Sequence, residues 1–178
     1  VFTDHGRVHC VRVWDVPSAG PAARGKALVN LIQIEPGDTV AAMTTTRGFP
    51  EDRYLLFATK RGLVKKTVLS AYGNVRAAGI IAINLEEDDE LLSVQVTDGE
   101  RQGFLGTRNG MGIKFTETDV RPIGRDTTGV KGIELKEGDE VVEMDLVDEG
   151  ATLLAVTELG YGKRTDVSEY RHQTRGGS

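Results

Sequence analysis

Short stretches in which apolar and polar residues alternate run along the whole chain, and they recur in one order. Four segments align, each with a glycine between two such stretches: VFTDHGRVHCVRV (1–13), FATKRGLVKKTVL (57–69), LGTRNGMGIKFTE (105–117) and AVTELGYGKRTDV (155–167). A period of two, rich in valine, isoleucine and leucine, is typical of β-strands, and the glycine predicts a tight turn. No segment of helix length shows a 3.6-residue period. The pattern predicts an all-β fold.

Two glycines mark every copy of this pattern. The first glycines are Gly6, Gly62, Gly110 and Gly160, and the second glycines are Gly25, Gly79, Gly129 and Gly176. After the second glycine, the first three copies continue with an apolar stretch, an acidic turn and another apolar stretch. These segments read LVNLIQI-EPGD-TVAAM, IIAINL-EEDDE-LLSV and VKGIEL-KEGDE-VVEM. Two strands joined by a short turn indicate a hairpin, so we predict about four strands in each copy.

All-β copies of roughly 50 residues bury their apolar faces against neighbouring copies, as in radial, propeller-like folds. We predict a single domain over residues 1–178 with repeats at approximately 1–48 (copy 1), 53–98 (copy 2), 103–149 (copy 3) and 151–178 (copy 4). Copy 4 stops at its second glycine, which leaves about three and a half repeats. We therefore expect the chain to be part of a longer array.

Composition narrows the classes of protein. A hydrophobic content of 39% in 178 residues is enough for a real core. The single cysteine, Cys10, excludes an internal disulfide framework and a multi-cysteine zinc site. The sequence contains no apolar run that could span a membrane and no visible secretory leader. These features predict a cytoplasmic protein.

Charge follows the same period as the glycines. Residues 6–26, 61–79, 108–132 and 160–178 carry net charges of +3, +4, +2 and +2, although the whole chain carries −5. In a radial fold these windows occupy equivalent positions, which predicts a basic belt with acidic residues elsewhere. A solvated face is the alternative explanation for any one cluster. With only 6% aromatic residues there is no ladder for stacking single-stranded bases, so the belt favours the backbone of duplex DNA.

Three phrases carry a resemblance to a known family: TKRGLVKKTVLSAY (59–72), VRPIGRDTTGVKGIELKEGDEVV (120–142) and GYGKRTDVSEY (160–170). They resemble the C-terminal domain of the DNA gyrase A subunit, from a bacterial type IIA topoisomerase, and the resemblance covers essentially the whole chain. It implies a β-pinwheel, in which neighbouring blades exchange strands, and a non-catalytic module that binds, bends and wraps duplex DNA. It also implies that the chain supports negative supercoiling alongside the gyrase A core and the gyrase B subunit, near the nucleoid. Catalytic residues would lie in other domains, and no membrane partner and no cofactor are implied.

The candidate DNA contacts are basic residues of the four positive windows. They are Arg7, Arg12, Arg24, Lys26, Lys65, Lys66, Arg76, Lys114, Arg121, Arg125, Lys131, Lys163, Arg164, Arg171 and Arg175. Copy 1 departs from the pattern, because Cys10 occupies the column held by Lys66, Lys114 and Arg164. The family's glycine-rich gyrase A box is absent in its full form. The segment QTRGGS (173–178) resembles it in part, with Thr174 and Ser178 in place of an arginine and the lysine.

Several other interpretations compete with this one. The corresponding domain of topoisomerase IV and a β-propeller scaffold for protein interaction are the alternatives for function. Trp14 and Asp15 form one isolated WD dipeptide, which is too little for a WD40 array. His5, His9 and His172 show no metal-ligand spacing, and no catalytic arrangement is recognisable. The acidic turns serve either as turn chemistry and for solubility, or to repel DNA from the wrong face.

Overall fold

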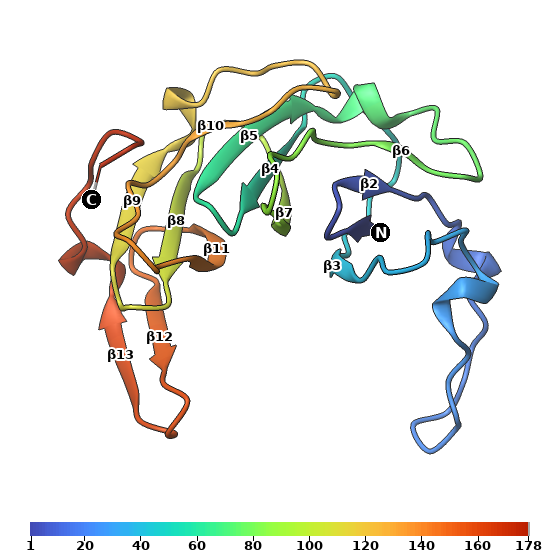
Figure 1. Cartoon of the computed structure of the whole chain (residues 1–178), viewed down its shortest axis with the longest axis horizontal. Coiled ribbons are helices and arrows are strands. Elements are labelled where there is room, and N and C mark those ends of the chain that lie inside the picture. Colours follow the sequence, from blue (N-terminus) through green and yellow to red (C-terminus); the bar gives the residue numbers. More distant parts are fainter. Residues whose placement is uncertain (178) are drawn as a thin grey trace.

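Four small antiparallel sheets follow one another along an arc (Figure 1). The computed structural model describes residues 1–177. The first sheet has the order β3 (Val40–Ala42), β1 (Phe2–Thr3), β2 (Arg7–Val8), β6 (Ile80–Ile81). The second has the order β10 (Val130–Lys131), β5 (Leu63–Val68), β4 (Tyr54–Thr59), β7 (Leu91–Thr97). The third contains β11 (Val141–Val147), β8 (Gln102–Thr107) and β9 (Gly112–Thr116), and the fourth β12 (Thr152–Val156) and β13 (Gly162–Asp166).

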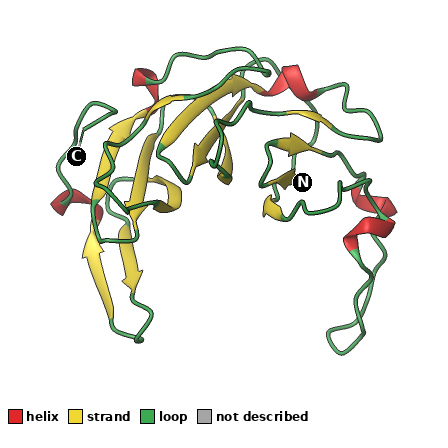
Figure 2. Cartoon of the chain, viewed as in Figure 1, coloured by secondary structure: helices red, strands yellow, loops and turns green. Residues whose placement is uncertain are grey.

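Helical structure within residues 1–177 is confined to single 3-10 turns between the strands (Figure 2). These turns are η1 (Val13–Asp15), η2 (Leu28–Asn30), η3 (Leu69–Tyr72), η4 (Glu117–Asp119) and η5 (Val167–Glu169). The all-β prediction is therefore confirmed. None of these turns approaches the length and apolar character that a membrane-crossing helix requires.

The short strand after the second glycine pairs with the preceding copy, not with its own. β6 of copy 2 lies antiparallel to β2 of copy 1, and β10 of copy 3 lies antiparallel to β5 of copy 2. The following strand returns to its own copy, because β7 pairs with β4 and β11 pairs with β8. The acidic turn thus joins two different sheets. The hairpin predicted across it is wrong, because the edge of the neighbouring sheet offers partners for the backbone groups of the exchanged strand.

Copy 1 also departs from the predicted strands. Its segment 28–34 contains the 3-10 turn η2 and no strand, although it occupies the position of β6 and β10 in the pattern. Those two strands form by joining the sheet of the copy before them. Among residues 1–177, segment 28–34 joins no sheet edge in this way.

Each first glycine sits in a turn built by the threonine three residues before it. In copy 2 the Gly62 N–H donates to the Thr59 carbonyl at 3.0 Å, and the Leu63 N–H donates to the Thr59 hydroxyl at 3.2 Å. Gly62 has a φ of +83°, a left-handed conformation that costs glycine little and other residues more. The same pair of bonds recurs in the other copies with these residues: Thr3 with Gly6, Thr107 with Gly110, and Thr157 with Gly160.

The hydrophobic core lies between the copies. Leu55 and Phe57 of β4 pack into a cluster shared with copy 1, whereas Leu56 and Ala58 pack into a second cluster shared with copy 3. Successive side chains of a strand point to opposite faces, so β4 is buried on both faces by its two neighbours. This explains why its sequence is continuously apolar instead of alternating. The predicted burial of faces against neighbouring copies is what holds the arc together.

Candidate nucleic-acid interface

The long loops that follow β5, β9 and β13 run along the outside of the arc. They are segments 69–79, 117–129 and 167–177, and the corresponding segment of copy 1 lies at the end of the arc beyond β2 (Figure 1). Each loop begins with a 3-10 turn and ends at the second glycine. The loop arginines of the candidate set therefore belong to the outer perimeter.

Most of the candidate basic residues are exposed. The exposed ones are Arg12, Arg24, Lys26, Arg76, Arg121, Lys131, Lys163, Arg164, Arg171 and Arg175. Arg7 and Arg125 are half-buried. All four copies contribute to this set, so we define the exposed residues as the basic perimeter. Their guanidinium and ammonium groups carry the charge type that phosphate neutralisation requires.

Three of the predicted contacts are not on this surface. Lys65, Lys66 and Lys114 have exposed fractions of 0%, 4% and 9%. The Lys65 ammonium donates to the Ala82 carbonyl at 2.8 Å and to the carbonyl of Arg125. This placement corrects the expectation that these lysines face DNA, because their ammonium groups are consumed by backbone carbonyls inside the protein.

Lys66 and Lys114 make the same connection in successive copies. The Lys66 ammonium donates to the Glu117 carbonyl of copy 3 at 2.7 Å, and the Lys114 ammonium donates to the Val167 carbonyl of copy 4 at 2.9 Å. Glu117 and Val167 occupy the same column of the pattern. We call this connection the lysine clamp, since it ties copy 2 to copy 3 and copy 3 to copy 4. In copy 1 the clamp position is Cys10, which is exposed and cannot donate in this way.

The backbone next to the clamp also links the copies. The backbone of Lys66 forms a parallel bridge with Pro122, and its carbonyl accepts the Ile123 N–H at 2.9 Å. Lys114 repeats both contacts, with His172 in the bridge and the Gln173 N–H at 2.9 Å. The outer loop of each copy is thus fastened along the strand of the copy before it.

Burial sets the electrostatics of the clamp. Desolvation lowers the pKa of Lys65 to about 8 and also lowers the pKa of Lys66, where the nearby Glu117 carboxylate opposes the shift. Burial raises the pKa of Glu117, although a hydrogen bond from Thr97 and the charge of Lys66 oppose this shift. The Thr97 hydroxyl donates to Glu117 Oε2 at 2.7 Å. Lys66 and Glu117 therefore lie buried together between copies 2 and 3, where each opposes the shift that burial causes in the pKa of the other.

Two loop arginines, the half-buried Arg125 and the exposed Arg175, reinforce the same joints with part of their hydrogen-bonding capacity. Arg125 donates to the Ile81 carbonyl at 2.7 Å, and Arg175 donates to the Lys131 carbonyl at 3.3 Å. Arg175 also donates to the Asp119 carbonyl at 2.8 Å. A guanidinium has five N–H donors, so each of these side chains keeps donors for a ligand.

The acidic turns act on the glycine turns of their own copies. The Asp89 carboxylate accepts the Arg61 N–H at 3.0 Å, and Asp139 accepts the Asn109 N–H at 3.0 Å. The next residue in each turn is a glutamate that pairs with a base: Glu90 with Lys60 at 2.5 Å, and Glu140 with Arg108 at 2.7 Å. These contacts support the turn-chemistry interpretation of the acidic residues.

The glycine-rich end of the chain lies beside copy 3. The Gly176 N–H donates to the Gly132 carbonyl at 2.7 Å, and the Gly177 carbonyl accepts the Glu134 N–H at 2.9 Å. It thus lies along the segment that follows β10 in copy 3. Ser178, the residue at the lysine position of the partial box, lies outside the described residues.

The lysine clamp was missed by sequence reasoning, although a signal was available. Lys65 and Lys66 follow Val64 on a strand where adjacent side chains point to opposite faces, so at least one of them had to point inward. Because both faces of copy 2 are covered by neighbours, both do. A lysine pair inside an apolar strand is therefore a sign of burial when the strand belongs to an internal repeat.

Comparison with known proteins places this architecture in a family. The family model described as "DNA gyrase C-terminal domain, beta-propeller" matches residues 1–47, 53–98, 104–148 and 151–178. The DNA gyrase A subunit of Haloquadratum walsbyi is 43% identical over 182 residues, which cover 99% of this chain and 21% of the relative. The DNA gyrase A subunit of Staphylococcus epidermidis is 44% identical, with 99% and 20% covered. The chain thus spans about a fifth of these curated relatives.

Solved structures agree with the family model. The C-terminal domain of DNA topoisomerase IV superposes with a TM-score of 0.90 at 32% identity, covering 99% of this chain and 55% of that domain. A DNA gyrase A C-terminal domain superposes with a TM-score of 0.83 at 26% identity, covering 99% and 56%. Both neighbours share the arrangement of successive sheets described above. The chain belongs to the family of DNA gyrase A C-terminal domains and has their strand-exchanged propeller fold, the β-pinwheel.

Proposed function

We propose that this chain binds the phosphate backbone of duplex DNA along its basic perimeter and bends the duplex around the arc. The observation that carries the proposal is the recurrence of exposed arginines in the outer loop of every copy, at Arg12 and Arg24, Arg76, Arg121, and Arg171 and Arg175. Charges repeated along one curved edge match a ligand with regularly spaced phosphates. The net charge of −5 does not oppose this, because acidic residues of copies 2 and 3 pair with bases away from the loops.

The lysine clamp supports the bending part of the proposal. Bending a site of 20–30 base pairs by 40–90° costs on the order of 1–6 kcal/mol, so a protein that bends DNA must resist the strain itself. Lys66 fastens copy 2 to copy 3 and Lys114 fastens copy 3 to copy 4 from within, and the loop arginines Arg125 and Arg175 fasten the outer loops. The curvature of the arc is therefore set before DNA arrives.

In the intact enzyme, the module would act with the gyrase A core and the gyrase B subunit, without catalysing a step itself. Its task would be to wrap a DNA segment so that strand passage by the other domains introduces negative supercoils. Phosphate contacts carry no sequence information, so binding should show little sequence preference. The module would act at the nucleoid, in the cytoplasm.

Binding across a salt series tests the proposal. We would titrate the chain with a duplex of 40–150 base pairs at roughly 50 to 200 mM salt, where each phosphate contact contributes about −0.9 to the slope of log K against log salt. Replacing Arg76, Arg121 or Arg171 by alanine should lower the slope by about one each. Lys136→Ala is the matched control, because Lys136 is an exposed base in an acidic turn. Equal slopes for all four variants would contradict the proposal.

The likeness to a topoisomerase IV domain favours a second candidate, in which the module binds DNA but wraps little. The two candidates differ in the product of the holoenzyme. Under the first, the holoenzyme would use ATP to introduce negative supercoils into relaxed plasmid. Under the second, it would only relax supercoils and separate linked circles.

A further inference from the structure

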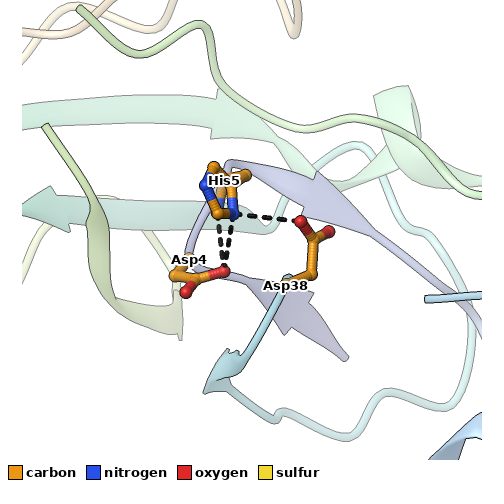
Figure 3. A group of neighbouring side chains, drawn as sticks. All are labelled: Asp4, His5 and Asp38. Carbon is orange, nitrogen blue, oxygen red and sulfur yellow. Dashed lines mark hydrogen bonds and ion pairs between the residues drawn. The ribbon is translucent and has the colours of Figure 1, made fainter. Parts of the chain in front are cut away.

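Asp4, His5 and Asp38 of copy 1 converge at its first glycine turn (Figure 3). Asp4 and His5 come directly before Gly6, and Asp38 comes from the acidic turn that precedes β3. His5 Nδ1 lies 3.0 Å from Asp4 Oδ1 and 3.0 Å from Asp38 Oδ1. The Asp38 side chain is only 7% exposed, and its Oδ2 has no hydrogen-bond partner. The histidine side chain is 60% exposed, so the group is open to solvent.

The other copies show what is unusual about this turn. Lys60 of copy 2 occupies the position of Asp4, two residues before the first glycine, and it pairs with Glu90 of the acidic turn at 2.5 Å. Copy 3 has the same pair, Arg108 with Glu140, at 2.7 Å. Each of these turns therefore contains its own cation, which balances the neighbouring carboxylates.

Copy 1 replaces that ion pair by an aspartate and a threonine. Thr39 stands where copies 2 and 3 have the glutamate, and its hydroxyl and N–H donate to the Asp4 carboxylate at 2.6 Å and 2.9 Å. Asp89 and Asp139, the counterparts of Asp38, also have one buried, unpaired oxygen, but they adjoin the lysine and arginine pairs. In copy 1 two carboxylates instead face one imidazole, and the described residues supply no lysine or arginine pair there.

We propose that this group binds a divalent cation of the zinc class, with His5 Nδ1, Asp4 Oδ1 and the Asp38 carboxylate as ligands. One imidazole and two carboxylates suit a first-row ion such as Zn²⁺ better than Mg²⁺, which prefers oxygen ligands alone. Metal–ligand bonds of about 2.0–2.2 Å around a common ion are compatible with donor atoms about 3 Å apart. His5 binds the ion through a deprotonated Nδ1, as every metal-bound imidazole nitrogen is. The ion leaves a fourth position for water on the exposed side.

In copy 1, the bound ion therefore takes the structural role that an ion pair has in copies 2 and 3. The ion holds the β1–β2 turn to the acidic turn of copy 1, as Lys60–Glu90 and Arg108–Glu140 do in copies 2 and 3. His5 alone shows no ligand spacing in the sequence, since its third ligand comes from the distant EPGD turn. The site lies in copy 1 and does not depend on DNA binding.

Calorimetric titration with Zn²⁺ tests the site, in a Cys10→Ser background so that the exposed thiol cannot bind the ion. We expect one ion per chain, no comparable heat with Mg²⁺, and affinity reduced at least about tenfold by His5→Ala, since even outer partners of a metal contribute 10–100-fold. His172→Ala and Asp89→Asn are the matched controls and should bind as the parent does. Equal binding by His5→Ala and the parent would overturn the proposal.

A second measurement avoids substitution altogether. Paramagnetic Co²⁺ should shift and broaden the ring signals of His5 in the NMR spectrum at concentrations that leave the signals of the distant His172 unchanged. If the His5 ring responds to pH but not to Co²⁺ or Zn²⁺, an imidazolium proton balances the two carboxylates, and the proposal is wrong.

Discussion

Replacing Lys66 by methionine tests whether this lysine holds the fold together or contacts DNA. Methionine has nearly the same length and apolar stem but no donor. The change removes bonds to the Glu117 carbonyl at 2.7 Å and to the Gly99 carbonyl at 3.2 Å, together with the cation–π contact to Tyr54 at 5.5 Å. It leaves the buried Glu117 carboxylate, whose Oε1 has no partner, without its counter-charge.

The expected loss of stability follows from these contacts. Hydrogen bonds to a charged group contribute about 1.5–3 kcal/mol each, and Lys66 donates two of them. Removal of the ammonium recovers part of this cost, because burial already lowers the pKa of Lys66 and so disfavours its charged form. We therefore expect Lys66→Met to lower the free energy of unfolding by about 3 kcal/mol.

Urea unfolding followed by far-UV circular dichroism measures this loss as a lower midpoint at unchanged slope. Lys163→Met is the matched control, because Lys163 is an exposed lysine on β13. The control should change stability by less than about 0.5 kcal/mol. For DNA the expectation is reversed: Lys163→Met should lower the salt slope by about 0.9, and folded Lys66→Met should keep it. If Lys66→Met unfolds with the parent and binds DNA with a lower slope, the clamp interpretation is refuted.

Three further predictions concern the joints between copies. Burial lowers the pKa of Lys65 to about 8 from 10.5 in the unfolded chain, so between these pH values the unfolded chain holds a proton that the folded one has lost. The unfolding free energy of the parent, measured relative to that of Lys65→Met, should therefore rise by about 2 kcal/mol between pH 8 and 10. If this relative free energy does not change over that range, Lys65 is not buried as a lysine of lowered pKa. Gly62→Ala should lower the free energy of unfolding by more than about 2 kcal/mol, because the new Cβ would lie 2.9 Å from Ile133 Cγ2 and the backbone φ is +83°. The control Gly138→Ala has a φ of +75° but open space around it, and it should lower this free energy by about 1–2 kcal/mol. Phe57→Ala should lower the free energy of unfolding by about 3–5 kcal/mol in the same urea assay, because Phe57 is wholly buried in the core between copies 1 and 2; a cost below 1 kcal/mol would place that core elsewhere.

The basic perimeter was accessible to sequence reasoning only in part. The loop arginines, such as Arg76 and Arg121, were predicted to face DNA because they belong to the recurring positive windows, and they are exposed. Lys65, Lys66 and Lys114 share the sign of charge and the phase of the pattern with them, yet they lie inside. Charge and spacing in the sequence are the same for a lysine that binds phosphate and for a lysine of the clamp. Both roles need a cation at the same place in the repeat.

The sequence by itself determined the features that depend on a few consecutive residues. Thr59 and Gly62 build their turn with each other, and a period of two favours extended backbone, so the repeat, the turns and the all-β class could be predicted. Only the tertiary structure decided the partners. β6 pairs with a strand of the preceding copy because the open edge of that sheet is available. Asp38 lies next to His5 because the chain returns to copy 1 after its long loop. Pairing and burial depend on which copy lies alongside, and that is a contact between residues far apart in the chain, which no local pattern specifies.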